Sequence, residues 1–178
     1  MPTEDEISRF FDFYKPGTVP RNAVVLMLNT GAARVDAVKL GPSNIFGDRI
    51  VYVRQKTENT NGQEINIPIH PHLRQMIDRI PRGHSTFLQT NSGIARSEKG
   101  LGKDMRKWCN AAGLPQCSSH GLRRAIARRL AESGASPHEI MAVTGHKTLR
   151  EVERYTRDAN RAKMADDAMN KLSRSVGE

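Results

Sequence analysis

The sequence is poor in the features that mark secreted, disulfide-linked or membrane-anchored proteins. Only two of its 178 residues are cysteines, Cys109 and Cys117, and their spacing matches no metal-binding motif. No apolar run is long enough to span a bilayer, and we find no signal peptide. We therefore expect a cytoplasmic protein with reduced thiols, no membrane association and no metal or other cofactor.

Acidic residues are also in short supply. The chain has 19 Asp and Glu against 28 Lys and Arg, which gives a formal net charge of +9. Basic side chains that neutralise phosphates release condensed counterions, so this excess favours a polyanionic partner. The alternative is a basic domain with no such partner. The length suits one domain with a substantial core.

The hydrophobic pattern predicts a mainly α fold with a small antiparallel β-sheet (α+β). Capping boxes at Thr3 with Glu6 and at Ser136 with Glu139 indicate helix starts, and from residue 71 onward the pattern is helical. Two β-branched segments, 49–56 and 64–69, flank an Asn-Gly turn signal and predict a hairpin. Lys56 falls just before that turn.

Chemically capable residues follow one another in a definite order. Arg34 follows "NTGAA", and Lys56 lies in "QKT". "HGLR" supplies His120 and Arg123, "TGH" supplies His146, and "ERYT" supplies Tyr155, one of three tyrosines. Each signal is weak alone, and Tyr155 by itself is more simply a packing residue. Together they resemble the catalytic set of the tyrosine recombinases, the phage-integrase family of DNA recombinases.

The resemblance implies a tyrosine recombinase catalytic-domain fold over residues 1–178, with a catalytic core (1–157) and a C-terminal tail helix (158–178). The family's N-terminal DNA-clamping domain is not part of this match. The tail either packs on its own domain or is exchanged between protomers. The implied partner is double-stranded DNA, bound as a tetramer by a protein that is monomeric without DNA.

The resemblance also implies a role for each residue. Arg123 and an N-terminal arginine would hold the scissile phosphate, because guanidiniums are planar, bidentate donors that stay charged. His120 and His146 would hydrogen-bond that phosphate, with His120 as a candidate base. Tyr155 would attack to form a 3′-phosphotyrosine, and Lys56 would protonate the departing 5′-oxygen.

One position departs from the family pattern. The first arginine usually lies three residues after the Thr of "TG-x-R", and here that position is Ala33, with Arg34 one residue later. Residues one apart on a helix point about 100° away from each other. Either Arg34 serves after an adjustment of the turn, or Ala33 marks the loss of the catalytic arginine.

Further basic residues are candidate phosphate contacts, with plain solvent exposure as the alternative reading of each. They are Arg124, Arg128, Arg129, Lys103, Arg106 and Lys107. His70 and His72 form an H-x-H pair that lacks further ligands, so surface residues fit better than a metal site.

The sequence is compatible with three functions. The first is a site-specific DNA recombinase (integrase), intact or inactivated at Ala33. The second is a non-enzymatic helix-turn-helix DNA-binding regulator, because "RRLAESGASPHEIMAVTG" predicts two helices joined at a glycine. That reading leaves Lys56 and Tyr155 without a role. The third is a type IB topoisomerase-like enzyme, which uses the same tyrosine chemistry.

Overall fold

The computed structural model describes residues 2–55, 62–157 and 161–175. The helices in these ranges are α1 (Glu4–Phe13), α2 (Val19–Thr30), α3 (Arg34–Ala37), the 3-10 turn η1 (Pro42–Asn44), α4 (Pro71–Ile77), α5 (Glu98–Ala111), α6 (Ser119–Glu132), α7 (Pro137–Thr144), α8 (Leu149–Arg157) and α9 (Arg161–Ser175). The strands are β1 (Ile45–Phe46), β2 (Arg49–Val53) and β3 (Glu64–Pro68). The predicted fold class, mainly α with a small antiparallel sheet, is confirmed.

Local sequence signals set most of these boundaries. Both predicted capping boxes are present, because the Thr3 and Ser136 hydroxyls accept from the backbone N–H groups of Glu6 and Glu139, whose carboxylates bond back. Gly31 ends α2 in a left-handed conformation with φ 65°, as glycine at this position commonly does. These caps place the starts of α1 and α7 and the end of α2.

The sheet has the strand order β1-β2-β3 and is antiparallel throughout. Ile50 pairs with Ile67 and Tyr52 with Ile65, so the inward face is apolar. The predicted hairpin is confirmed in its two strands, whereas its turn and Lys56 lie outside the described residues. The two-residue strand β1 was not predicted.

The expectation of a helical pattern from residue 71 onward was wrong for residues 78–97. This segment is irregular apart from one isolated bridge between Gln89 and Ala95. It contains Pro81 and two glycines with positive φ, Gly83 at 91° and Gly93 at 75°, and these residues stop helix formation.

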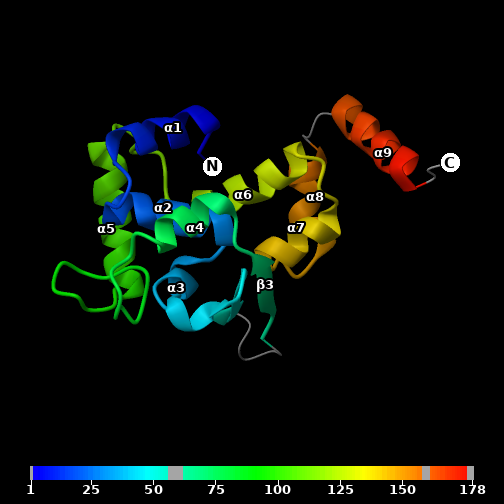
Figure 1. Ribbon diagram of the computed structural model, residues 1–178. Coiled ribbons are helices and arrows are strands. Elements are labelled where there is room, and N and C mark those ends of the chain that lie inside the picture. The colour runs from blue at the N-terminus through cyan, green and yellow to red at the C-terminus, as the bar shows by residue number, and fades with distance from the viewer. Residues whose placement is uncertain (1, 56–61, 158–160, 176–178) are drawn as a thin grey trace.

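Helix α6 joins the two parts of the core. Its first half contributes Leu122 and Ala125 to the main cluster around α2 and the sheet, and its second half contributes Ala127 and Ala131 to a smaller cluster with α7 and α8. Figure 1 shows α6 running from the middle of the molecule toward α7 and α8, with α9 beyond them. In the described ranges, no helix is both long enough and apolar enough to cross a membrane.

Candidate active site

Three distant segments meet at the end of α2. Arg123 of α6 is buried, at 7% exposure, and its Nη1 donates to the Gly31 carbonyl at 2.7 Å. A Cβ atom on Gly31 would lie only 3.3 Å from Thr144 Cα at the end of α7. The "NTG", "HGLR" and "TGH" segments are therefore adjacent in space, as a shared site requires.

A second buried arginine lies in the same place, and sequence reasoning missed it. Arg54 follows β2, is 7% exposed, and donates from Nη1 to the carbonyl of Gly145. Its Nε lies 4.0 Å from Oδ2 of the buried Asp36. The alternation of β2, with Ile50 and Tyr52 inward, could have placed residue 54 on the inner side.

His146 is buried beside these arginines. Its Nδ1 lies 2.5 Å from the Thr144 hydroxyl, which itself donates to the Ile140 carbonyl at 2.6 Å. A hydroxyl has one proton, so Nδ1–H must be the donor to Thr144, and the neutral ring then carries its lone pair on Nε2. Burial, followed by the charge of Arg123, lowers the pKa of His146 to about 4.

Tyr155 lies next to His146, with 6.1 Å between the two ring centroids. The side chain is 8% exposed and packs in the smaller core cluster with Ile140 and Val152. Its hydroxyl accepts from Arg154 Nη2 at 2.9 Å. The structure thus makes Tyr155 a packing residue whose ring borders the buried basic site. Its role as the nucleophile stays a prediction.

A surface pocket opens beside Arg123. Its lining includes Ala33, Arg34, Gln55, His120 and Arg123. His120 is exposed on the first turn of α6. Lys56 lies outside the described residues, although its neighbour Gln55 is on this wall. Tyr155 and His146 do not line the open pocket.

Arg34 lines the pocket, but its guanidinium is turned toward α5. Nη2 of Arg34 lies 3.4 Å from Glu98 Oε1, and the Arg34 side chain is 41% exposed. A Cβ atom on Gly102 of α5 would lie 2.1 Å from Arg34 Nη1. Ala33 is the N-cap residue of α3 and has no side chain that could hold a phosphate.

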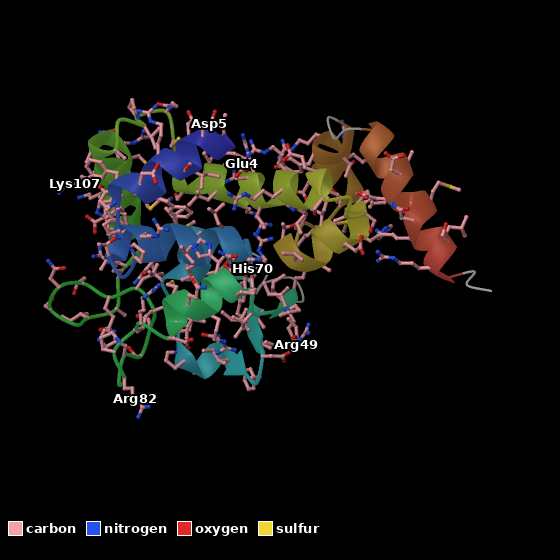
Figure 2. The ribbon with its side chains drawn as sticks, turned by 45° about the horizontal axis from the view of Figure 1, so that its top comes forward. Glu4, Asp5, Arg49, His70, Arg82 and Lys107 are labelled. Atoms are coloured by element: carbon pink, nitrogen blue, oxygen red, sulfur yellow. The ribbon has the colours of Figure 1, made fainter. Side chains whose placement is uncertain are left out.

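The predicted DNA contacts divide into two groups. Lys103, Arg106 and Lys107 line a groove along α5, together with Arg34 and Lys99. Arg124 is half-buried. Two other α6 residues bind α1, because Glu4 accepts from Arg128 Nη2 at 2.6 Å and from Arg129 Nη2 at 2.7 Å. Figure 2 shows Glu4 beside α6 and Lys107 on α5, away from α7 and α8.

The remaining histidines and the thiols have structural surroundings. His70 caps α4 by accepting from His72 N–H, and half-buried His72 packs edge-on against Phe11 at 5.7 Å. No group of three metal-ligating side chains is found in the part of the chain that the structure describes. Cys109 and Cys117 are free and buried, and burial raises the pKa of both thiols.

The low pKa of His146 has a measurable consequence. Between about 4 and its ordinary value of 6.5 the unfolded state binds more protons than the folded state, so stability falls as the pH drops through this window. About 3 kcal/mol of stability is lost in this way between neutral pH and pH 4. We expect the ring signals of His146 in NMR to stay unchanged from pH 8 down to pH 5.5.

The variant His146→Asn separates the effect of the histidine from that of the other titrating groups. Glu4, Glu6, Glu139 and Glu151 also have lowered pKa values, and they lose stability in acid as well. The difference between wild type and variant in the free energy of unfolding at pH 7 and pH 5 isolates the histidine. A His146 signal that titrates near pH 6.5 would contradict the buried, neutral assignment.

Comparison with known proteins indicates the family of this chain. The sequence matches the model of the phage integrase family over residues 2–161. It is 29% identical over 147 residues to the integrase of Mycobacterium phage L5, covering 78% of this chain and 38% of that protein. It is 24% identical over 154 residues to the tyrosine recombinase XerC of Bifidobacterium longum (strain DJO10A), covering 76% and 43%.

A solved lambda integrase dimer bound to a COC′ core site has the same fold, with a TM-score of 0.71 and 22% identity over 90% of this chain and 60% of that chain. The chain spans less than half the length of the two curated relatives. The family match covers nearly the whole chain, and the chain belongs to the phage integrase family.

Proposed function

We propose that this chain is the catalytic domain of a site-specific DNA recombinase that cuts and rejoins strands through a 3′-phosphotyrosine. The observation that carries the proposal is the convergence of Arg123 of α6, His146 from the turn between α7 and α8, and Tyr155 of α8 in one buried basic site. This site borders a pocket lined by His120. Membership of the family makes DNA strand breakage and rejoining the expected chemistry.

In this proposal the Tyr155 oxygen forms a bond to the scissile phosphorus, and the bond from phosphorus to the 5′-oxygen breaks. Arg123 neutralises the charge that develops on the non-bridging oxygens. Lys56, which lies outside the described residues, supplies the proton for the 5′-oxygen. The resulting phosphotyrosine keeps the energy of the broken bond, so a second 5′-hydroxyl can reverse the step.

Two histidines are candidates to accept the phenolic proton. His120 is exposed at the pocket. His146 is in ring contact with Tyr155. Its imidazole is neutral, and its hydrogen bond to Thr144 leaves the lone pair on Nε2. Because Tyr155 is only 8% exposed, attack requires α8 to shift or the phosphate to enter between α6 and α8.

Several features of the assembly belong to the same proposal. Residues 1–157 form the catalytic core and 158–178 the tail, and the active species is a tetramer on DNA in the cytoplasm. In the single chain, α9 lies against the turn between α6 and α7, because a Cβ atom on Gly134 would be 2.8 Å from Asp167 Oδ2. Met169 and Leu172 are 61% and 53% exposed, which suits docking on a second protomer.

The test uses nicked, end-labelled duplexes of randomised sequence. A nick beside the cleavage position releases a short fragment, which traps the covalent complex. We expect a labelled band that survives SDS and migrates with the protein. A helix-turn-helix regulator would give no such band, and its absence with all duplexes would refute the enzyme assignment. A topoisomerase-like enzyme would give the band and relax plasmids without exchanging strands.

The groove along α5 makes a separate prediction about DNA affinity. If Lys103 and Lys107 contact phosphates, Lys103→Ala and Lys107→Ala should each reduce the slope of log K against log salt by about 1. The matched control is Arg82→Ala, which removes one exposed charge from the 78–97 loop, away from Lys107 in Figure 2. Fluorescence anisotropy between 50 and 200 mM salt measures the slopes, and equal slopes in all variants would remove α5 from the DNA interface.

A further inference from the structure

Among the described residues of the buried site, cationic side chains outnumber carboxylates. Arg54 and Arg123 are each 7% exposed, and among the described residues the buried carboxylate beside them is Asp36, 3% exposed. His146 is neutral at physiological pH, since its pKa is about 4. Among the buried groups that the structure describes, two guanidiniums therefore face one carboxylate in a region largely shielded from water.

The two arginines are held in equivalent ways by different parts of the chain. Arg123 donates to the carbonyl of Gly31, which ends α2, and Arg54 donates to the carbonyl of Gly145, which ends α7. Both glycines have a left-handed backbone, with φ 65° and 64°. Each guanidinium is therefore fixed against rigid backbone at the junction of helices.

The charge of Arg54 acts on the residues that the proposed reaction uses. It is the second-largest cause, after burial, of the lowered pKa of Arg123, and it also lowers the pKa of His146. Such effects require the guanidinium to lie close to both groups. Burying two guanidiniums close together costs desolvation free energy and charge repulsion, and an anion bound between them offsets both.

Arg34 differs in each of these respects. Its side chain is 41% exposed, and its guanidinium pairs with Glu98 and lies against Gly102. An exposed pair of this kind contributes little stability, and it leaves the arginine directed at α5. Ala33, at the position where the family pattern has arginine, offers no donor.

We propose that Arg54 is the second guanidinium of the phosphate clamp, and that together with Arg123 it binds the scissile phosphate in place of an arginine at position 33. This proposal rests on the proposed recombinase function. It makes the chain an active enzyme despite Ala33. The same site would bind a free inorganic phosphate, which has the same charge and oxygen geometry.

The first experiment measures single-turnover cleavage of the trapped duplex described above. Arg54→Ala should reduce the rate about 100-fold or more, the loss that follows removal of one donor to a developing anion. Arg54→Lys keeps the charge but loses the planar fork, so it should fall between wild type and Arg54→Ala. The matched control, Arg82→Ala, removes an exposed charge from the 78–97 loop and should cleave within about threefold of wild type.

A neutral substrate separates a direct role from a structural one. A methylphosphonate at the cleavage position carries no charge for a guanidinium to neutralise, so the deficit of Arg54→Ala should shrink to less than about tenfold. Adding Ala33→Arg to Arg54→Ala should restore part of the rate on the ordinary phosphate. An equal deficit on both substrates would assign Arg54 a purely structural role and overturn the proposal.

Two other results would also overturn it. One is cleavage at the wild-type rate by Arg54→Ala protein that thermal melting shows to be folded. The other is cleavage only in proteins that carry Ala33→Arg, whatever residue is at position 54. If no protein cleaves, Ala33→Arg included, the recombinase function fails instead.

A titration with inorganic phosphate tests the anion site separately from cleavage. NMR signals of the Arg54 and Arg123 Nε–H groups should shift on phosphate addition in wild type, with affinity at least tenfold weaker in Arg54→Lys and unchanged in Arg82→Ala. The absence of any shift in wild type would overturn the site as well. Shifts without cleavage would retain Arg54 as an anion ligand in a protein that does not cut DNA.

Discussion

Tyr155→Phe is expected to form no covalent complex with DNA, while binding the same DNA with unchanged affinity. Phenylalanine keeps the ring that packs against Ile140 and Val152 and touches His146, and it removes only the oxygen that would bond to phosphorus. The lost hydrogen bond comes from exposed Arg154, so the free energy of unfolding should change by less than about 1.5 kcal/mol. The labelled SDS-resistant band and filter binding measure the two effects.

The other two tyrosines make this variant a clean test. The hydroxyl of Tyr52 donates to the Thr30 carbonyl at 3.1 Å, and burial raises its pKa. Burial also raises the pKa of Tyr14, whose hydroxyl donates to the Trp108 carbonyl at 3.2 Å. Neither is prepared to ionise, so a covalent band that persists in Tyr155→Phe would show that the nucleophile is not a tyrosine of this site.

Arg123→Met is expected to slow cleavage about 1000-fold, because removing one preorganised donor to a developing anion costs 10²- to 10³-fold and Arg123 is the buried centre of the clamp. Its pKa is lowered to about 10, by burial first and then by Arg54. It thus remains charged at neutral pH, at a cost in desolvation. Replacing such a cation by an apolar side chain should change the free energy of unfolding by less than about 2 kcal/mol.

This separation of rate from stability distinguishes catalysis from architecture. Arg123 also donates to the Gly31 carbonyl, so a structural role would appear as a parallel loss of rate and stability in Arg123→Met. Arg123→Lys should bind DNA normally and cleave faster than Arg123→Met, since it retains the charge without the fork. Chemical denaturation and single-turnover kinetics on the same preparations decide between the two.

The sequence predicted the elements whose signals are local. The capping boxes at Thr3 and Ser136 depend on residues three apart, and the glycine after α2 lies next to the helix that it ends. The ordered set of catalytic candidates was also visible, since His146 and Tyr155 are linked by one short helix. Their rings are adjacent in space, with 6.1 Å between centroids, whereas their catalytic roles stay predictions.

What escaped prediction depends on long-range packing. Arg128 and Arg129 look like a continuous basic face, yet they bind Glu4, more than 120 positions away along the chain. Tyr155 is buried because residues of α6 and α7 pack against α8. Arg54 belonged to no motif, and only the meeting of β2 with the end of α7 brings it to Gly145.

The most direct test of the account is peptide mapping of the trapped protein–DNA complex after nuclease digestion. The proposed mechanism requires a single modified peptide, spanning Tyr155, with a nucleotide attached to the phenolic oxygen through its 3′-phosphate. A nucleotide on any other side chain, or one attached through a 5′-phosphate, would contradict it.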